Sequence, residues 1–469
     1  MIRSLIIFGA TGDLTARYLM PALADLMEAG HLSALVKIVG VAQHPWGGEE
    51  FRRHIEKQLE RHAAAVSLDA RQALLARLEY QAADVTNPAQ VAAITGALAQ
   101  PVLAYLALPS HLFAPLLEAL AAAHLAAGSR VMVEKPFGHN LASAQALNRL
   151  VHVSFHEEAV FRVDHFLGMP GVQNLLAMRL GNRLLEQLWS SRHIERIECI
   201  WDETLALEGR ASYYDRTGAL RDMVQSHLLQ VLCLIGMEPP CGSSVDDLRD
   251  RKVELLRSII RDPGREPAPR SRRARYGAGQ IGRRALPAYA EEAGVDPARR
   301  TETFVELDLR IGNARWAGVP FMLRTGKALA RDRQEVVVHF RPPDAAAGVL
   351  ASNEDVRPNS LRLPLGSSRI ALGLTVAEKP DPYSLQPLAL EADAPFSGCP
   401  PYSRLLLDAL KGEPSRSVRD DEVEESWRIV DLILEAWAAG ASPLQTYPAG
   451  SDGPASGQPA DFEISRTVS

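Results

Sequence analysis

The chain has 469 residues, of which 46% are hydrophobic and 23% are charged, a composition typical of a folded globular protein. Because a single hydrophobic core stops growing at roughly 250–300 residues, we expect two or three domains. The formal net charge of −6 argues against a generally cationic protein that binds nucleic acid or membranes.

The cysteines and the apolar runs bear on the compartment. Cys199, Cys233, Cys241 and Cys399 form no C-x-x-C pair, so neither a disulfide framework nor a cysteine-ligated zinc site is indicated, and no metal site is predicted. The longest apolar run begins at Leu228, is interrupted by Gln230, and has about half of the roughly 20 residues that span a bilayer. With no signal peptide recognised, we expect a cytoplasmic protein without a membrane partner.

Short aliphatic runs alternate with longer periodic segments in the first part of the chain. Strands are predicted at residues 4–8, 36–41, 102–106 and 130–133. Segments 15–28 and 113–126 repeat apolar residues at three- and four-residue spacing, as amphipathic helices do. This alternation is typical of a parallel sheet covered by helices, so we predict an α/β, Rossmann-like dinucleotide-binding domain over residues 1–157.

The pattern changes after residue 158. Strand-like runs at 194–201, 303–311, 335–340 and 369–374 are separated by long, irregular connections. This favours an α+β domain with a large, mainly antiparallel sheet over residues 158–469, where we place substrate binding and oligomerisation. The Arg-, Pro- and Gly-rich stretch 261–284 is predicted to be a solvated surface loop, with phosphate binding as its alternative, and the chain after Tyr447 is predicted to fray.

The first predicted strand runs into Gly9-Ala10-Thr11-Gly12-Asp13-Leu14, and a helix follows directly. Glycines here let the backbone turn tightly and approach a pyrophosphate, which the N–H groups and dipole of a helix N-terminus stabilise. The G-x-x-G spacing is looser than G-x-G-x-x-G, and a tight turn without a ligand has the same pattern. These six residues are candidate cofactor contacts.

Gln43 stands near the end of the second predicted strand, where dinucleotide-binding proteins distinguish their cofactors. An acidic residue there binds the ribose hydroxyls of NAD, and an arginine binds the 2′-phosphate of NADP. A glutamine can hydrogen-bond a hydroxyl but cannot neutralise a phosphate dianion. We therefore expect NAD to be used at least as well as NADP, unless Gln43 is an ordinary turn residue.

Four further segments carry polar residues more densely than packing alone requires. They are EKPFG (134–138), RVDHFLG (162–168), EGRASYYD (208–215) and RDMVQSHLLQ (221–230). Each has a simple structural alternative: His227 as a satisfied core histidine, Lys135 as a loop lysine and Asp164 as a helix cap.

Taken together, these segments resemble the glucose-6-phosphate dehydrogenase family along nearly the whole chain. The similarity continues in YLALP (105–109), VQNLL (172–176), ETF (302–304), WAGVPFMLRTGKAL (316–329), DEVEESWRIVD (421–431) and TYPAGS (446–451). The resemblance implies oxidation of C1 of a glucose-type pyranose to its lactone, with hydride transfer to NAD or NADP on the N-terminal domain. It also implies a homodimer or homotetramer, because family members commonly associate through the C-terminal sheet.

The resemblance assigns roles residue by residue. His227 matches the general base, a role that suits an imidazole with an ordinary pKa of about 6.5. Asp164 matches the carboxylate that orients this histidine and stabilises its imidazolium. His165 matches a phosphate ligand. The matches to residues that hold the sugar are Lys135, which is also a candidate cofactor contact, and Glu208, Asp222 and Lys327.

Four ligand-binding positions depart from the family pattern. The family motif reads His-Tyr-Leu-Gly-Lys, whereas this chain has Phe166 and Met169 in place of the tyrosine and the lysine. Asp332 stands where the family usually has a cation, and Gln43 stands where NADP-preferring members have an arginine. Losing two hydrogen bonds to a charged group, at about 1.5–3 kcal/mol each, lowers affinity for a phosphosugar by roughly two to four decades.

Three functional hypotheses follow. The first is a sugar 1-dehydrogenase with an altered pocket for the C6 substituent, acting on unphosphorylated or 6-modified glucose; Asp332 would suit an amino group. The second is an ordinary glucose-6-phosphate 1-dehydrogenase in which nearby arginines replace the lost contacts, the candidates being Arg331, Arg333, Arg272 and Arg273. The third is a non-catalytic paralogue that acts as a partner or regulator. The intact His227 and Asp164 favour retained C1 oxidation.

Overall fold

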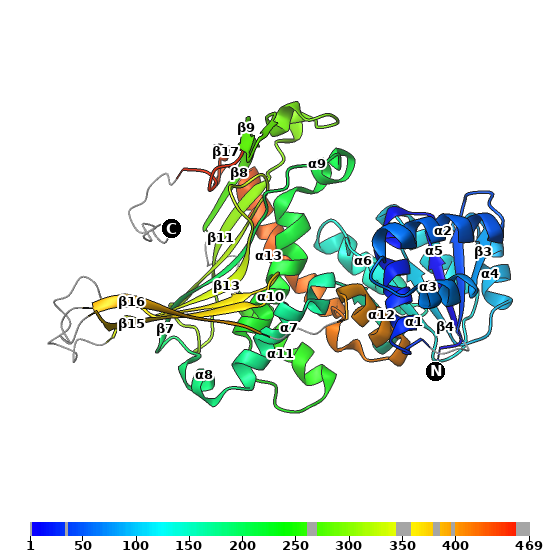
Figure 1. Ribbon diagram of the computed structural model, residues 1–469, viewed down its shortest axis with the longest axis horizontal. Helices are drawn as coiled ribbons and strands as arrows, with labels where there is room; N and C mark the ends of the chain where they lie inside the picture. Colours follow the sequence, from blue (N-terminus) through cyan, green and yellow to red (C-terminus); the bar gives the residue numbers. More distant parts are fainter. Residues whose placement is uncertain are drawn as a thin grey trace. The chain divides into compact units, whose positions relative to one another are not determined.

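A computed structural model of the protein describes residues 2–32, 36–259, 270–343, 358–378, 385–394 and 399–455. The chain forms two compact units, each assembled from several segments (Figure 1). The first unit comprises Met1–Gln187, Gln230–Ser258 and Ala394–Asp431. The second comprises Leu188–Leu229, Ile259–Asp393 and Leu432–Ser469.

A parallel sheet forms the centre of the first unit. Within the described residues its six strands have the order β3-β2-β1-β4-β5-β6. They are β1 (Ser4–Phe8), β2 (Lys37–Ala42), β3 (Leu78–Ala82), β4 (Val102–Leu106), β5 (Arg130–Glu134) and β6 (Val160–Val163). The strand order reverses at β1, whose two neighbours are β2 and β4, and in open α/β sheets ligands bind at the carboxyl ends of the strands beside such a point.

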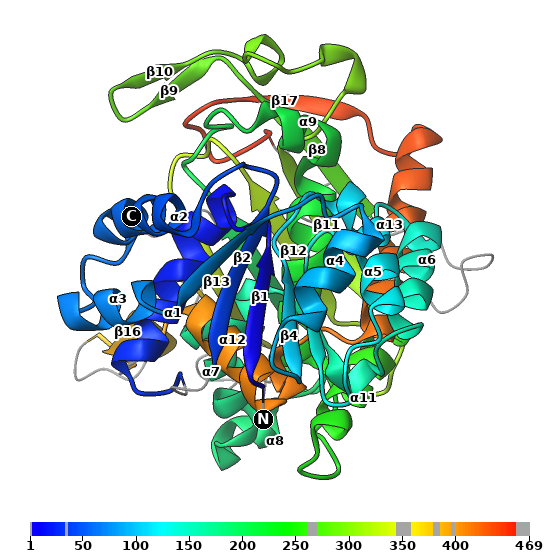
Figure 2. The ribbon, with the colours of Figure 1, turned by 90° about the vertical axis from the view of Figure 1, so that its right-hand side faces the viewer.

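Helices cover both faces of this sheet. In Figure 2, α1 to α3 lie on one side of the strands and α4 to α6 on the other. Their bounds are α1 (Met20–Glu28), α2 (Gly48–His62), α3 (Leu68–Leu75), α4 (Pro88–Gly96), α5 (Phe113–Ala122) and α6 (Leu141–His152). Because both faces are covered, β1 and β4 are buried over their whole length, as their aliphatic sequences require.

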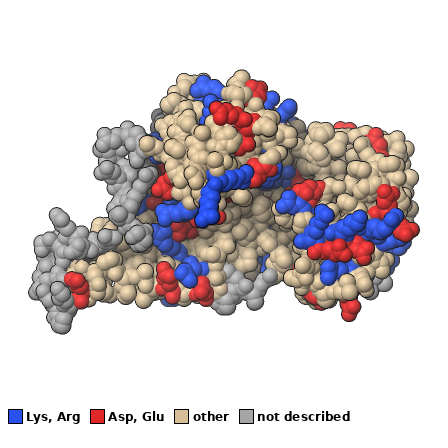
Figure 3. Space-filling view, turned by 45° about the horizontal axis from the view of Figure 1, so that its top comes forward, with Lys and Arg blue, Asp and Glu red and all other residues tan. Residues whose placement is uncertain are grey.

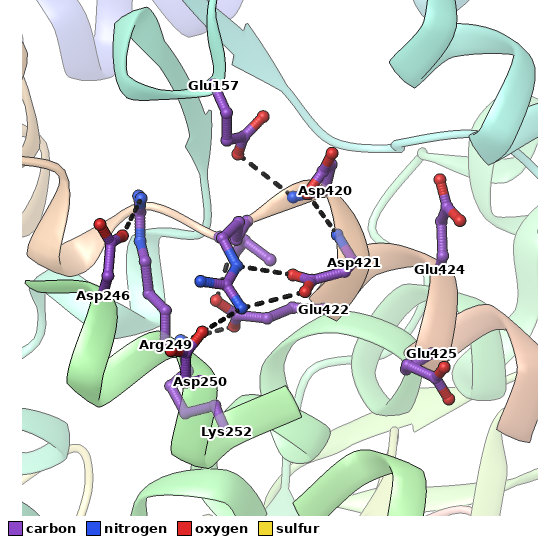
Figure 4. Close-up of polar contacts among 12 residues, drawn as sticks. Glu157, Asp246, Arg249, Asp250, Lys252, Asp420, Asp421, Glu422, Glu424 and Glu425 are labelled. Atoms are coloured by element: carbon purple, nitrogen blue, oxygen red, sulfur yellow. Dashed lines mark hydrogen bonds and ion pairs between the residues drawn. The ribbon is translucent and has the colours of Figure 1, made fainter. Parts of the chain in front are cut away.

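Later helices complete the first unit. They are α7 (Pro170–Leu180), α8 (Arg183–Leu188), α10 (Leu229–Gly236), α11 (Val245–Ser258), α12 (Pro401–Lys411) and α13 (Asp420–Ala438); α8, α10 and α13 cross the limits of the unit. The N-terminus of α13 is held to α11 by ion pairs (Figure 4). Lys252 Nζ lies 2.6 Å from Glu422 Oε2, and both side chains are buried. Arg419 joins Asp250 of α11 to Asp421 of α13.

A mixed sheet forms the second unit. Its nine strands in the described residues have the order β16-β15-β14-β13-β7-β12-β11-β8-β17, and only the pairs β7–β12 and β8–β17 are parallel. The bounds are β7 (Ile194–Asp202), β8 (Arg270–Gly277), β11 (Phe304–Arg310), β12 (Pro320–Gly326), β13 (Arg333–Phe340), β14 (Ser360–Pro364), β15 (Arg369–Ala377), β16 (Leu385–Asp393) and β17 (Leu444–Pro448). The short hairpin of β9 (Gly279–Ile281) and β10 (Arg284–Leu286) and helix α9 (Ala211–Ala219) also belong to this unit.

The predicted fold class is confirmed: a parallel α/β sheet lies in the N-terminal part and a large, mostly antiparallel sheet in the C-terminal part. The four predicted N-terminal strands correspond to β1, β2, β4 and β5, within one residue at each end. The boundary between residues 157 and 158 stays a prediction, since the compact units mix segments from both sides of it.

The prediction of a surface loop at 261–284 is wrong for Arg270–Gly277, which form β8 between β11 and β17. Ala274 and Tyr276 are buried, whereas Arg272 turns outward and pairs with Glu306 at 3.0 Å. Arginines at half of the strand positions hide the apolar alternation that usually reveals a strand. Residues 261–269, like the tail from 456 onward, lie outside the described residues.

On the face drawn in Figure 3, basic and acidic side chains are interspersed and do not form a single basic stripe. Among the described residues, no helix has the length and apolar character that crossing a bilayer requires.

Candidate active site

The glycine turn follows β1 at the point where the strand order of the first unit reverses. Gly9 has a φ of +89°, and a Cβ atom there would collide with the carbonyl oxygen of Ala107. The N–H groups of Gly9 and Ala10 both donate to Val41 O, at 2.8 and 3.1 Å, which ties the turn to the end of β2. Only glycine fits the first position, so the turn is held open where a ligand could approach the backbone.

A helix begins at once after this turn. Thr15 Oγ1 donates to Gly9 O at 3.1 Å, and a π-helical segment, Thr15–Leu19, leads into α1. The first turn of a helix leaves N–H groups without partners inside the helix, and its dipole favours an anion. The turn Gly9–Leu14 therefore fits the pyrophosphate of a dinucleotide.

The end of β2 lies beside the turn. Thr11 Oγ1 and His44 Nδ1 are 3.0 Å apart, so the structure brings the Gln43–His44 segment next to the predicted cofactor contacts. Gln43 is exposed and hydrogen-bonds Asp84, which follows β3. Hydrogen bonds from the Thr86 backbone and side chain, and then from Gln43, hold the pKa of Asp84 below its ordinary value. Asp84 is therefore an ionised carboxylate next to Gln43 at neutral pH.

Lys135 and Asp164 emerge from neighbouring strands. β5 ends at Glu134, which pairs in register with Val163 of β6, so the residues that follow each strand lie at the same edge of the sheet. Lys135 is half-buried and Asp164 is fully buried. Asp164 Oδ1 accepts the N–H of Phe166 at 3.0 Å and thereby starts a 3₁₀ turn, His165–Gly168.

Glu134 and Tyr105 form a buried pair behind this edge. Tyr105 Oη donates to Glu134 Oε1 at 2.5 Å. Burial raises the pKa of Glu134 to about 7, although the Tyr105 hydroxyl and the Lys135 cation lower it in part. A carboxyl group with this pKa is protonated in a large fraction of molecules at neutral pH.

The segment after Asp164 packs against α12. His165 is half-buried, and its ring lies parallel to the ring of Tyr402, with centroids 6.0 Å apart. Phe166 is buried, with its ring edge against His165, and Met169 is half-buried where α7 begins. Tyr402 is a residue that the sequence analysis missed; its only signal is its position three residues before LLLDAL (405–410), a further stretch that resembles the family.

Tyr402 brings a phenol to this part of the first unit. Its ring also contacts Tyr18, with centroids 5.3 Å apart. Burial raises the pKa of Tyr402, and the negative charges of Glu134 and Asp164 raise it further, which indicates that the phenol is near both carboxyl groups. Tyr402 therefore places a phenol, which can donate a hydrogen bond, near the His165 ring.

Asp222 and His227 share one helical segment of the second unit. This segment, Leu220–Leu228, is wound as a π-helix and is called η5 here. His227 is buried and Asp222 is half-buried, where its Oδ1 accepts the Tyr213 hydroxyl at 3.2 Å. Wide π-helical turns occur frequently at functional sites.

Lys327 follows β12 and is buried. Its Nζ lies 2.6 Å from Glu203 Oε2 and 5.3 Å from the ring centroid of Tyr214. Burial raises the pKa of Tyr214, and the charge of Asp222 is the next cause, so Asp222 and Lys327 both lie near the same tyrosine. The structure thus brings together two of the predicted sugar contacts, and η5 carries the predicted base with them.

Glu208 and Asp332 have local partners. Glu208 is exposed, has a φ of +49°, and pairs with Arg284 of β10 at 2.7 Å. Asp332 Oδ1 accepts the backbone N–H of Thr204 at 2.6 Å and its hydroxyl at 3.1 Å. Asp332 therefore holds the loop after β7. The predicted pairing of Asp164 with His227 stays a prediction, because the two residues belong to different units.

Two family models together match most of the chain. The glucose-6-phosphate dehydrogenase NAD-binding domain matches residues 6–174, and the glucose-6-phosphate dehydrogenase C-terminal domain matches residues 176–460. The chain belongs to the glucose-6-phosphate dehydrogenase family. Members are NAD(P)-dependent oxidoreductases of glucose metabolism, so this protein is an enzyme of that class with a dinucleotide-binding domain.

Individual family members cover almost the whole chain. A glucose-6-phosphate 1-dehydrogenase of Mycolicibacterium smegmatis is 39% identical over 96% of this chain and 94% of its own length. The crystal structure of the Mycobacterium avium enzyme matches with a TM-score of 0.84 and 34% identity over 97% of this chain and 95% of its own. A glucose-6-phosphate dehydrogenase in complex with glucose 6-phosphate matches with a TM-score of 0.86 and 30% identity, over 97% of this chain and 96% of its own.

Proposed function

We propose that the protein is a glucose-6-phosphate 1-dehydrogenase that oxidises C1 of glucose 6-phosphate to the 1,5-lactone while NAD or NADP takes the hydride. The observation that carries the proposal is the similarity, over 97% of the chain, to an enzyme solved with glucose 6-phosphate bound. The comparisons favour this hypothesis over the altered pocket suggested by Phe166, Met169 and Asp332.

The reaction needs a base at C1 and groups that hold the ring. In the proposal, neutral His227 takes the proton of the C1 hydroxyl as hydride leaves C1, and Asp164 stabilises the imidazolium that forms. Lys327 and Asp222, which both lie near Tyr214, hold the pyranose together with Lys135 and Glu208. Bound NAD or NADP supplies the hydride acceptor, and the turn Gly9–Leu14 holds its pyrophosphate.

Phe166 and Met169 stand where the family has a tyrosine and a lysine for the substrate phosphate. Phe166 is buried against His165, and the missing phenol is replaced in our proposal by Tyr402, whose ring lies parallel to His165. Asp332 is engaged by Thr204, which argues against a role in binding an amino group. Among the arginines considered as substitutes, Arg333 pairs with Glu335, Arg272 with Glu306, and Arg273 donates to Ser442 O.

The cofactor preference is a separate proposal. Gln43 beside the ionised Asp84 offers hydrogen bonds to ribose hydroxyls and no cation for a 2′-phosphate. We therefore propose that NAD is used at least as well as NADP. A strong preference for NADP would show that Gln43 is not the deciding contact.

Initial rates for glucose 6-phosphate, glucose and 6-amino-6-deoxyglucose, each with NAD and NADP, test the proposal. We expect kcat/KM for glucose 6-phosphate to exceed that for glucose at least 100-fold, since a bound phosphate adds several charge-assisted hydrogen bonds. A preference for either unphosphorylated sugar would restore the altered-pocket hypothesis. No turnover and no ligand-induced stabilisation would favour the non-catalytic paralogue.

Two sets of variants test the phosphate end. Tyr402→Phe is expected to raise KM for glucose 6-phosphate by roughly 10- to 100-fold, the range for one hydrogen bond to a charged group, with KM for the cofactor unchanged. The double substitution Phe166→Tyr with Met169→Lys is expected to change kcat/KM less than about tenfold. A sharp gain from the double substitution, with no effect of Tyr402→Phe, would contradict the role of Tyr402.

We also propose a homodimer or homotetramer, on the family resemblance alone. Light scattering at several protein concentrations measures the mass in solution. A monomer at micromolar concentration would contradict it.

A further inference from the structure

Whatever fixes the start of η5 also fixes Asp222 and His227, because both residues lie on that segment. η5 is separated from α9 by a sharp break at Gly218, whose φ is +73°. A Cβ atom on Gly218 would collide with the carboxylate of Glu302. The glycine therefore leaves the space that the Glu302 side chain occupies.

Glu302 holds the first residues of η5 with a buried carboxyl group. Its Oε1 accepts the backbone N–H of Leu220, the first residue of η5, at 3.0 Å. Its carbonyl oxygen accepts the N–H of Ala219 at 3.1 Å. These N–H groups lie at the start of a helix, where no intrahelical acceptor exists, so Glu302 caps η5 from a distant part of the chain.

The next residue, Thr303, holds the backbone of Lys327. Thr303 O accepts the N–H of Lys327 at 2.9 Å. Tyr447 Oη donates to Lys327 O at 2.6 Å and is itself hydrogen-bonded to Thr303 Oγ1 at 2.9 Å. Both backbone groups of Lys327 are therefore fixed by Thr303, directly or through Tyr447.

Glu302 and Thr303 thus connect the two elements that carry candidate sugar contacts. One side of the dipeptide holds η5, with Asp222 and His227, and the other side holds the end of β12, with Lys327. Both residues are buried within the second unit, at 6% and 0% exposure, so water does not compete for these hydrogen bonds.

We propose that Glu302 is a positioning residue, which sets the placement of the η5 base and ring-binding groups relative to Lys327 through its hydrogen bond to Leu220. It touches neither substrate nor cofactor. The inference rests on the proposed function, because it assumes that residues of η5 and Lys327 bind and oxidise the sugar. A misplacement of reacting groups by about 1 Å lowers rates roughly 100-fold, so the loss of one cap can matter for turnover.

The substitutions Glu302→Ala and Glu302→Gln test the proposal. The alanine removes the acceptor for Leu220 N–H, and we expect kcat with glucose 6-phosphate to fall roughly 10- to 100-fold while KM for NAD(P) stays unchanged. The glutamine keeps a neutral oxygen acceptor of the same length, and we expect it to retain kcat within about threefold. A purely structural role would lower the melting temperature of both variants without changing kcat per folded molecule.

A second measurement does not depend on turnover. Hydrogen exchange of the 219–228 backbone amides should accelerate at least tenfold in Glu302→Ala and stay near the wild-type rate in Glu302→Gln. If the wild-type protein oxidises no sugar, the proposed function fails, yet this measurement still tests the cap. If the wild-type protein is active and Glu302→Ala has the same kcat and the same exchange, the positioning proposal is overturned.

Two further variants serve as comparisons. Glu306→Ala removes a carboxylate four residues after Glu302, from strand β11; Glu306 pairs with Arg272 at 3.0 Å, so we expect kcat within about twofold of wild type. Gly218→Ala leaves Glu302 intact but pushes a methyl group against its carboxylate, so it should lower kcat as Glu302→Ala does. An equal loss in Glu306→Ala would show that removing any carboxylate from this part of the chain is harmful and would contradict a specific role for Glu302.

Discussion

Glu134 lies in an environment unlike that of an ordinary surface carboxylate. Its carboxyl group is buried behind Lys135 and hydrogen-bonded by Tyr105, and its pKa is raised from 4.5 to about 7. The folded state therefore binds this proton more tightly than the unfolded state does. The resulting stabilisation is fully present below about pH 4.5 and is lost as the pH rises to about 7.

The substitution Glu134→Gln should remove this pH dependence, because glutamine mimics the protonated form and keeps an acceptor for Tyr105. We expect the free energies of unfolding of wild type and variant to be similar at pH 4.5. At pH 8 the variant should be more stable by about 3 kcal/mol at most, since each pKa unit corresponds to about 1.4 kcal/mol. Urea denaturation at a series of pH values measures the difference, and a gap that does not vary with pH would contradict it.

Among the candidate site residues, the sequence was most informative where the relevant feature depends only on a residue and its neighbours in the chain. The glycine turn needs a positive φ at Gly9, and the presence of glycine at this position indicates such a conformation. Gln43 was predicted from its place at the end of a strand, and Asp164 and His227 from short motifs, whereas Tyr402 and Glu302 contact residues far away in the chain. Their side chains carry no motif of their own, so only the three-dimensional structure reveals their partners.

At the scale of helices and strands, the spacing of apolar residues and the burial of each element determined which elements the sequence could predict. β1, β2, β4 and β5 are buried strands with short aliphatic runs, and they were found nearly to the residue. β3 lies at the sheet edge with only Leu78 and Tyr80 turned inward, and β8 carries four arginines, so neither shows an apolar pattern. The π-helical turn Thr15–Leu19 was predicted as part of an ordinary helix, because a wider winding leaves nearly the same apolar spacing.

The junction of α11 and α13 allows a stability test at this scale. Lys252 and Glu422 (Figure 4) form a buried ion pair at 2.6 Å. Gln230 of α10 also donates to Glu422, at 3.0 Å. Glu422→Leu leaves the Lys252 ammonium buried without its partner, and we expect a loss of about 3–5 kcal/mol in the free energy of unfolding. Adding Lys252→Met should recover most of that loss, because an apolar pair of similar volume often packs as well as a buried ion pair.

Chemical denaturation of the two single variants and the double variant measures this coupling. Arg257→Ala is a suitable comparison, because Arg257 forms a more exposed pair with Glu425 between the same two helices, at 3.5 Å. Such a pair contributes at most about 1 kcal/mol. If the double variant is as unstable as the worse single variant, the buried pair does not account for the loss.

At the scale of the whole molecule, the strand order 3-2-1-4-5-6 and the mixed nine-stranded sheet could not be read from the sequence pattern. The sequence predicted the two classes of sheet, but the pairing of β17 with β8 joins residues more than 160 positions apart. Each unit also collects segments that are distant in sequence, which local periodicity does not encode. Family resemblance did not supply the strand order either; it implied the activity and the candidate site residues, because it compares the whole order of motifs at once.

The division of candidate contacts between the two units leads to a prediction about ligand binding. The turn Gly9–Leu14 and Gln43 belong to the first unit, whereas Asp222, His227 and Lys327 belong to the second. NAD alone should therefore slow hydrogen exchange mainly in segments 4–19 and 37–44. Glucose 6-phosphate alone should slow it in segments 203–228 and 320–332 of the second unit, and also in segment 164–169 of the first unit, which carries the predicted phosphate ligand His165. At 100 times its dissociation constant, a ligand that binds only the folded state adds about 2.7 kcal/mol to the free energy of unfolding, so the melting temperature should rise with each ligand.

Gly9→Ala, which cannot adopt the turn without displacing Ala107, should abolish the NAD effect and leave the sugar-phosphate effect in place. Loss of both effects in that variant would mean that the two units do not bind their ligands independently.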